Sequence, residues 1–116
     1  MIECKKEAIE KDRVDEWFQQ WLTLEKKIHA THSKREDAKA YMLEAILLYE
    51  GFIIQASKTS EQQLINETYE VLPINGLERL AFIKNRPGQY ACYRQLAELF
   101  GETKKRCARL RLKHAK

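Results

Sequence analysis

The chain has 116 residues, of which 44% are apolar and 33% charged, with only four glycines and two prolines. This length and composition predict one folded domain, or one small domain with a helical extension, and argue against a disordered chain. No apolar run approaches the roughly 18 residues needed to cross a bilayer. The N-terminus carries acids where a signal peptide needs an apolar segment, so we expect a cytoplasmic protein.

Charge is distributed unevenly along the sequence. The net charge is +4, but residues 1–72 carry ten Lys or Arg against fourteen Asp or Glu, and residues 73–116 carry eleven against three. The two parts therefore have net charges of −4 and +8. A strongly basic C-terminal part predicts a polyanionic partner.

The cysteines and histidines show no recognisable zinc-ligand spacing. Cys4, Cys92 and Cys107 are far apart and form no C-x-x-C pair. His29 and His32 are three residues apart, but we expect them in a loop. The sequence therefore predicts free thiols, no bound metal and no cofactor.

The first predicted helix runs from about Glu3 to Ile28. Its apolar residues recur at spacings of three and four, and Trp17, Phe18 and Trp21 fall within five positions. Such a wide apolar face has to be covered by another element.

A second long helix is predicted after a turn at residues 30–33. Ser33 followed by Glu36 fits a capping box, and the helix continues to about Lys58. Its apolar stripe is broad, and Gly51 in its interior costs roughly 1 kcal/mol relative to alanine, which is consistent with a bend or a close helix approach. The surplus apolar surface of this hairpin predicts a homodimer; the alternative is a monomer whose C-terminal helices cover it.

A third, shorter helix is predicted from Thr59 to about Leu72. Pro73–Gly76 then interrupts the pattern and marks the best candidate boundary. We therefore interpret residues 1–72 as a helical hairpin plus a short helix that serves dimerisation or a partner protein. Residues 73–116 form the second region.

Three further helices are predicted in this basic region. One runs from Leu77 to about Asn85, and a turn at residues 86–88 follows, since proline does not continue a helix. The next helix spans Tyr93 to Phe100. Gly101 is expected to end it, after which a final basic helix begins.

Residues 77–112 resemble the helix-turn-helix DNA-binding family, in the three-helix form of many repressors and plasmid or phage regulators. Ala97 stands at the small position of the first helix, and Gly101 follows four residues later at the turn. Thr103 fits the cap of the recognition helix, and Cys107 and Leu110 fit its apolar positions. The resemblance implies a C-terminal helix-turn-helix unit. With the helical hairpin predicted for residues 1–72, the expected fold is all-α.

The resemblance also implies how the last helix meets DNA. Glu102 departs from the family pattern, which has an apolar residue directly after the glycine. The candidate base-contacting residues are Thr103, Lys104, Lys105, Ala108 and Arg109, with Arg109 suited to guanine. The candidate phosphate contacts are Arg94, Gln95, Arg106, Arg111, Lys113 and Lys116.

The sequence therefore predicts a dimeric double-stranded DNA-binding protein. It would be a transcriptional regulator, or an accessory factor of plasmid or phage replication or transfer. The alternative is a protein–protein interaction module that uses the apolar hairpin, with the basic C-terminus assisting nucleic-acid binding. RNA binding stays open, because Tyr90 and Tyr93 near the basic stretch are able to stack on bases. We expect no enzyme, because phosphate-loop, metalloprotease and serine-hydrolase motifs are absent.

Overall fold

The computed structural model describes residues 1–115 and is built from helices. The elements are the short 3-10 helix η1 (Lys6–Ile9) and the α-helices α1 (Lys11–Ser33), α2 (Lys39–Gln55), α3 (Gly76–Asn85) and α4 (Tyr90–His114). The predicted all-α class is confirmed. Within the described part of the chain, pairing of extended segments is limited to two isolated bridges, Ile2 with Tyr69 and Cys4 with Ser57.

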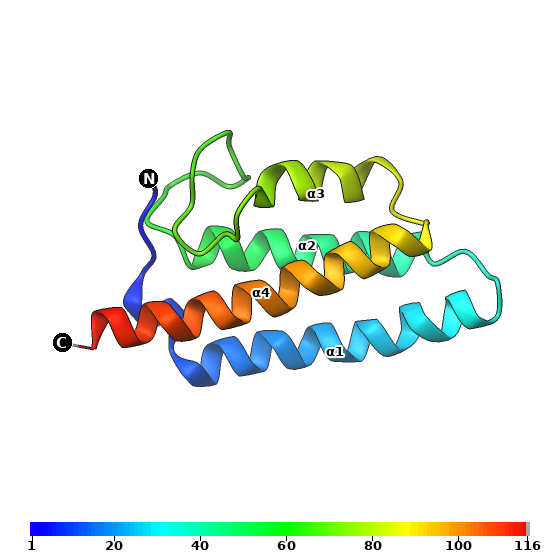
Figure 1. Ribbon diagram of the computed structural model, residues 1–116, viewed down its shortest axis with the longest axis horizontal. Helices are drawn as coiled ribbons and strands as arrows, with labels where there is room; N and C mark the ends of the chain where they lie inside the picture. The colour runs from blue at the N-terminus through cyan, green and yellow to red at the C-terminus, as the bar shows by residue number, and fades with distance from the viewer. Residues whose placement is uncertain (116) are drawn as a thin grey trace.

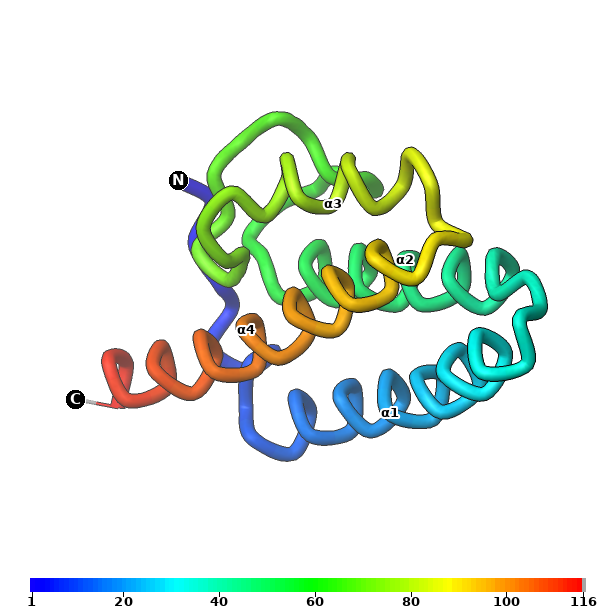
Figure 2. Tube along the Cα trace, turned by 45° about the vertical axis from the view of Figure 1, so that its right-hand side comes forward, coloured from blue at the N-terminus to red at the C-terminus, as the bar shows by residue number. Residues whose placement is uncertain are grey.

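The four α-helices run in alternating directions along the long axis of the molecule. Figure 1 shows α4 crossing the front between α1 and α3, with α2 behind it, and the same order is visible in the tube of Figure 2. Helix α4 packs along both α1 and α3, and α2 packs mainly against α1. The last helix therefore lies at the centre of the fold, and only its outer face is open to solvent.

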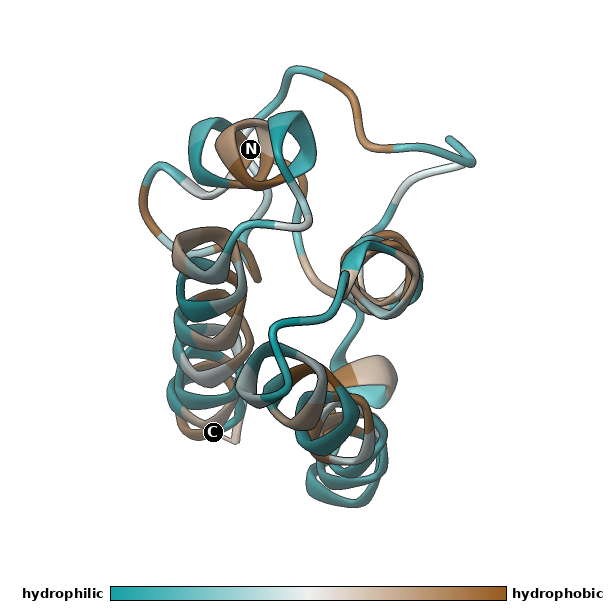
Figure 3. Ribbon diagram, turned by 90° about the vertical axis from the view of Figure 1, so that its right-hand side faces the viewer, coloured by the Kyte–Doolittle hydropathy of each residue, from teal (hydrophilic) through white to brown (hydrophobic). Residues whose placement is uncertain are grey.

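Helix α1 is amphipathic, and its apolar stripe is the one that its sequence spacing predicts. Val14, Trp17, Trp21, Leu24 and Ile28 are buried, at intervals of three and four residues that place them on one side of a helix. Helix α2 is apolar around most of its circumference. It is the largely brown helix seen nearly end-on in Figure 3.

The start of α1 and its connection to α2 differ from the predictions. Residues before Lys11 form an extended segment and η1, so no single helix runs from Glu3. Helix α1 continues to Ser33, which places His29 and His32 in a helix and excludes the predicted capping box. Arg35 has a φ of 58°. Asp37 Oδ1 then accepts the backbone N–H of Lys39 at 2.9 Å, so an aspartate holds the start of α2.

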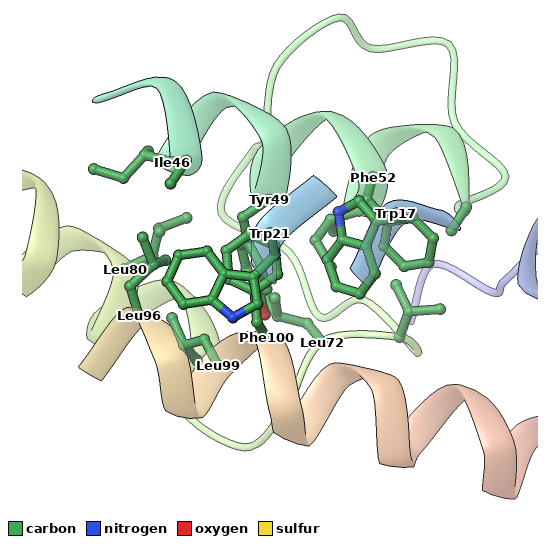
Figure 4. Packing of buried hydrophobic residues seen from close by; sticks show 14 of the residues in the cluster. Trp17, Trp21, Ile46, Tyr49, Phe52, Leu72, Leu80, Leu96, Leu99 and Phe100 are labelled. Carbon is green, nitrogen blue, oxygen red and sulfur yellow. The ribbon is translucent and has the colours of Figure 1, made fainter. Parts of the chain in front are cut away.

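Aromatic rings from three helices form the centre of the core (Figure 4). Trp21 of α1 stacks on Phe100 of α4 with ring centroids 4.3 Å apart, and Trp17 stacks on Phe52 of α2 at 4.1 Å. Tyr49 meets Phe100 edge-on at 5.1 Å. Both sequence regions thus contribute to one hydrophobic core, and Phe100 is where their rings meet.

The predicted helix from Thr59 to Leu72 does not form. Residues 56–75 are turns, bends and irregular structure between α2 and α3. The N-terminal segment takes up backbone hydrogen bonds of this connection instead: Ile2 N–H donates to Thr68 O at 2.7 Å, and Glu70 N–H donates to Ile2 O at 2.9 Å. The irregular stretch is therefore fixed by pairing with residues that are far away in sequence.

Helix α3 begins at Gly76 and ends at Asn85, close to its predicted bounds. A Cβ atom at Gly76 would overlap the side chain of Leu72, so any other residue here requires Leu72 to shift. Leu80 and Ile83 are buried, and Arg79 faces α4. Helix α3 therefore packs on α4 through one short apolar side.

The predicted helix-turn-helix is absent, because α4 is one continuous α-helix of 25 residues from Tyr90 to His114. Gly101 lies in its interior and has no positive φ, so it makes no turn. Leu96, Leu99, Thr103, Cys107 and Leu110 are all buried. Their spacing of three and four continues without a break past the glycine, and burial of this single stripe stabilises one continuous helix.

Candidate nucleic-acid interface

A groove between α1 and α4 collects basic side chains around an apolar floor. We call it the α1–α4 groove; its lining residues are Lys11, Asp15, Phe18, Gln19, Leu22, Gly101, Lys104, Lys105, Ala108 and Arg111. Four of these are cations and one is a carboxylate, so the lining carries a net charge of +3 at neutral pH. Gly101 contributes no side chain, and a Cβ there would meet nothing within 4 Å.

Two of the groove cations are held by α1. Lys104 Nζ lies 4.4 Å from the centre of the Phe18 ring and 4.0 Å from Asp15 Oδ1. Asp15 also pairs with Lys11 at 2.6 Å, and the hydrogen bond from Lys11 lowers the pKa of Asp15. The single carboxylate of the groove is thus shared between two lysines, which leaves the groove positively charged.

Two cations point away from the protein on the outer face of α4. Lys105 and Arg109 are exposed, and they lie one helical turn apart, about 6 Å along the axis. Within residues 1–115, neither has a carboxylate partner among the ion pairs. These two side chains are the part of the basic surface that is most available to a polyanion.

Other predicted DNA-contacting residues have structural partners. The Arg106 Nε–H donates to the backbone oxygen of Glu70, and the Arg111 guanidinium donates to Ile9 O at 2.8 Å. Lys113 Nζ lies 3.7 Å from a carboxylate oxygen of Glu70. These basic residues thus dock the last turns of α4 onto the N-terminal segment and the α2–α3 connection.

Thr103 is not a helix cap, and it is not available to DNA in this structure. Its side chain is fully buried and its hydroxyl lies 2.7 Å from the Tyr49 hydroxyl. Burial raises the pKa of Tyr49, so the phenol stays protonated and is able to donate. This pair satisfies two hydroxyl groups inside an otherwise apolar core.

The remaining predicted contacts spread over the surface of α4. Arg94 is exposed and Gln95 is partly exposed, but both lie near the start of the helix, away from the groove. Ala108 lines the groove. Lys116 lies outside the described residues.

The structure explains why a glutamate occupies position 102, where the helix-turn-helix pattern has an apolar residue. It faces α3, where the Arg79 guanidinium donates to both of its carboxylate oxygens, at 3.1 and 2.5 Å. These hydrogen bonds lower the pKa of Glu102 and raise that of Arg79. An apolar residue at this position would leave Arg79 without its bidentate partner.

Sequence reasoning missed the contribution of α1 to this surface. Lys11, Phe18 and Leu22 line the groove, and they belong to the acidic part of the chain. The signal available was the half-buried side of α1: Phe18 and Leu22 fall outside the fully buried stripe, at the edge where a second helix packs.

The chain belongs to the YpoC-like protein family, whose profile matches residues 11–115. This assignment corrects the predicted membership of the helix-turn-helix family, in agreement with the continuous α4. A relative from Bacillus subtilis (strain 168), named "Uncharacterized protein YpoC", is 48% identical over 44 residues. That match covers 38% of this chain and only 27% of the relative.

No solved structure matches the chain. Among the described residues, no helix combines the length and apolar character required to span a membrane. The fold and the α1–α4 groove are therefore described from the structure of this chain alone.

Proposed function

We propose that the protein binds double-stranded DNA through the α1–α4 groove and the outer face of α4. The observation that carries this proposal is the concentration of cations there. The groove lining, Lys105 included, has a net charge of +3, and exposed Arg109 on α4 adds one more cation beside it. A surface of this kind attracts phosphates and releases their counterions on binding.

The proposed mode of binding is contact with the phosphate backbone. A helix packed against neighbours on both sides, as α4 is by α1 and α3, presents one ridge of side chains. Base reading by Arg109 was expected from a protruding recognition helix, which this fold lacks. We therefore propose weak dependence on DNA sequence, and a role as an accessory factor at DNA in preference to an operator-specific regulator.

Salt dependence tests this proposal directly. If Lys104, Lys105 and Arg109 each neutralise one phosphate, the affinity for a random duplex has a log–log slope of about −2.7. Raising the salt from 50 to 200 mM then weakens binding roughly 40-fold. Fluorescence anisotropy with a labelled random duplex measures this slope, and a duplex RNA of the same length tests whether the surface prefers DNA.

Matched charge variants locate the surface. Lys105→Ala and Arg109→Ala should each reduce the magnitude of the slope by about 1 and weaken binding to all sequences alike. Lys34→Ala is the control, because it removes the same charge from an exposed residue of the α1–α2 connection. Absence of duplex binding at low salt, or equal losses in all three variants, would refute the proposal.

A second candidate function, self-association, is favoured by the outer face of α2. Leu43 and Leu47 lie one helical turn apart and are 44% and 69% exposed, and a Cβ atom added at Gly51, one turn further, would meet nothing within 4 Å. We propose that this stripe pairs with the same stripe of a second copy, with Gly51 allowing close approach. Sedimentation equilibrium tests it: Leu47→Lys should shift a dimer to a monomer, and a monomeric wild-type protein would exclude the idea.

A further inference from the structure

Three potential metal ligands that are far apart in the sequence meet where the N-terminal segment, the α2–α3 connection and the end of α4 join. They are the thiol of Cys4, the carboxylate of Glu70 and the imidazole of His114, and one ligating atom from each lies within 4.8 Å of the other two. The Cys4 Sγ and His114 Nε2 atoms are 3.8 Å apart. We propose that these three side chains bind one zinc ion.

The donor set suits zinc. Thiolate, imidazole and carboxylate are its three usual protein ligands, with bond lengths near 2.3 Å to sulfur and 2.0–2.1 Å to nitrogen. Tetrahedral angles with those bonds place sulfur and nitrogen about 3.5 Å apart, close to the separation seen here. Three protein ligands leave a fourth position for water.

Charge balance also favours a divalent cation at this place. Cys4 and Glu70 are 3% and 5% exposed, and a buried carboxylate needs hydrogen-bonding or cationic partners. A thiolate, a carboxylate and Zn²⁺ sum to zero. Lys113 is the one cation paired with Glu70 among the described residues, at 3.7 Å. Its side chain is 67% exposed, so it is free to swing into solvent when a metal binds.

Two of the ligands are already held in place by the backbone. The Cys4 N–H donates to Glu70 Oε1 at 3.0 Å, and the flanking Lys5 N–H donates to Ala56 O at 2.7 Å. His114 is supplied by the last turn of α4. Metal binding would therefore join the C-terminal end of α4 to the N-terminal segment and to the α2–α3 connection. Both of these segments are far from the end of α4 in the sequence.

Isothermal titration of the metal-free full chain with zinc chloride tests the proposal. One Zn²⁺ per chain is expected, with a rise in melting temperature as zinc is added. Cobalt substitution gives a second measurement, since a cobalt–thiolate bond adds a near-ultraviolet charge-transfer absorption that depends on Cys4. His114→Gln and Cys4→Ser should each weaken zinc binding at least about tenfold.

The controls are His29→Gln and Cys92→Ala, which remove a histidine and a cysteine elsewhere and should bind zinc as the wild type does. His114→Gln keeps the test valid if Cys4→Ser fails to fold, because His114 is partly exposed and lies in the last turn of α4. Failure of the wild type to bind one equivalent of zinc, or unchanged binding by a folded His114→Gln variant, would overturn the proposal.

Discussion

Replacing Gly101 with alanine should stabilise the protein. In this structure Gly101 lies inside α4, eleven residues after Tyr90, and a Cβ at this position meets nothing within 4 Å. The substitution therefore adds helix propensity without a clash, worth about 0.8–1.0 kcal/mol. With an unfolding entropy of about 2.1 cal/mol/K per residue, that gain corresponds to a rise in melting temperature of about 3–4 °C.

Thermal unfolding followed by circular dichroism measures the change. Gly51→Ala is a positive control, because Gly51 is also helical and open, and it should give a gain of similar size. Gly76→Ala should instead lower the melting temperature, because its Cβ overlaps Leu72. The reasoning would be refuted by a Gly101→Ala variant that melts several degrees below the wild type, as expected if Gly101 occupied a turn with positive φ.

Two further substitutions test the packing around α4. Tyr49→Phe should lower the free energy of unfolding by about 1–2 kcal/mol, because it leaves the buried hydroxyl of Thr103 without its partner; a loss close to zero in urea titration would show that the hydroxyl pair contributes nothing. Glu102→Gln should lower stability at neutral pH and lose its effect in acid. The folded-state pKa of Glu102 is depressed by hydrogen bonds from Arg79, so its contribution is complete above the unfolded pKa of about 4.3 and disappears as pH falls through the lower folded value. Parallel melting curves for wild type and Glu102→Gln between pH 3 and 7 should therefore converge at the acidic end, and a constant offset would contradict this assignment.

Local patterns in the sequence predicted the helices well where a helix buries a single apolar face against the core. The spacing of Trp17, Trp21 and Ile28 defines the inner face of α1, and α3 lies where Leu80 and Ile83 indicate it. The all-α class follows from these stripes. A helix that buries one apolar stripe is specified by the spacing of its own residues, so periodicity is enough to predict it.

The predicted turn at Gly101 was wrong because a short motif was given more weight than a longer apolar pattern. Ala97 and Gly101 match a turn, but Leu99, Thr103, Cys107 and Leu110 follow the periodicity of one uninterrupted helix. Tertiary packing on α1 and α3 overcomes the roughly 1 kcal/mol cost of a helical glycine. The buried stripe, counted across the glycine, was the more informative signal.

Other features depend on contacts between distant residues. The absence of a helix at residues 59–72 reflects pairing of this stretch with Ile2. Arg106 and Arg111 were predicted to contact phosphates, yet they donate to backbone oxygens of the protein itself. The meeting of Cys4 with His114, 110 residues apart, leaves no trace in local spacing. Such contacts depend on how the whole chain folds, so they are not predictable from a short stretch of the sequence.

Mapping the bound duplex on the protein surface tests the central functional claim most directly. In nuclear magnetic resonance spectra of the ¹⁵N-labelled chain titrated with random duplex DNA at low salt, the proposal predicts the largest amide shifts at residues 101–113 of α4 and residues 11–22 of α1. Amides of α2 should be nearly unaffected, and added salt should reverse the shifts. A lack of any change, or shifts centred on Leu43 and Leu47 of α2, would contradict DNA binding through the α1–α4 groove.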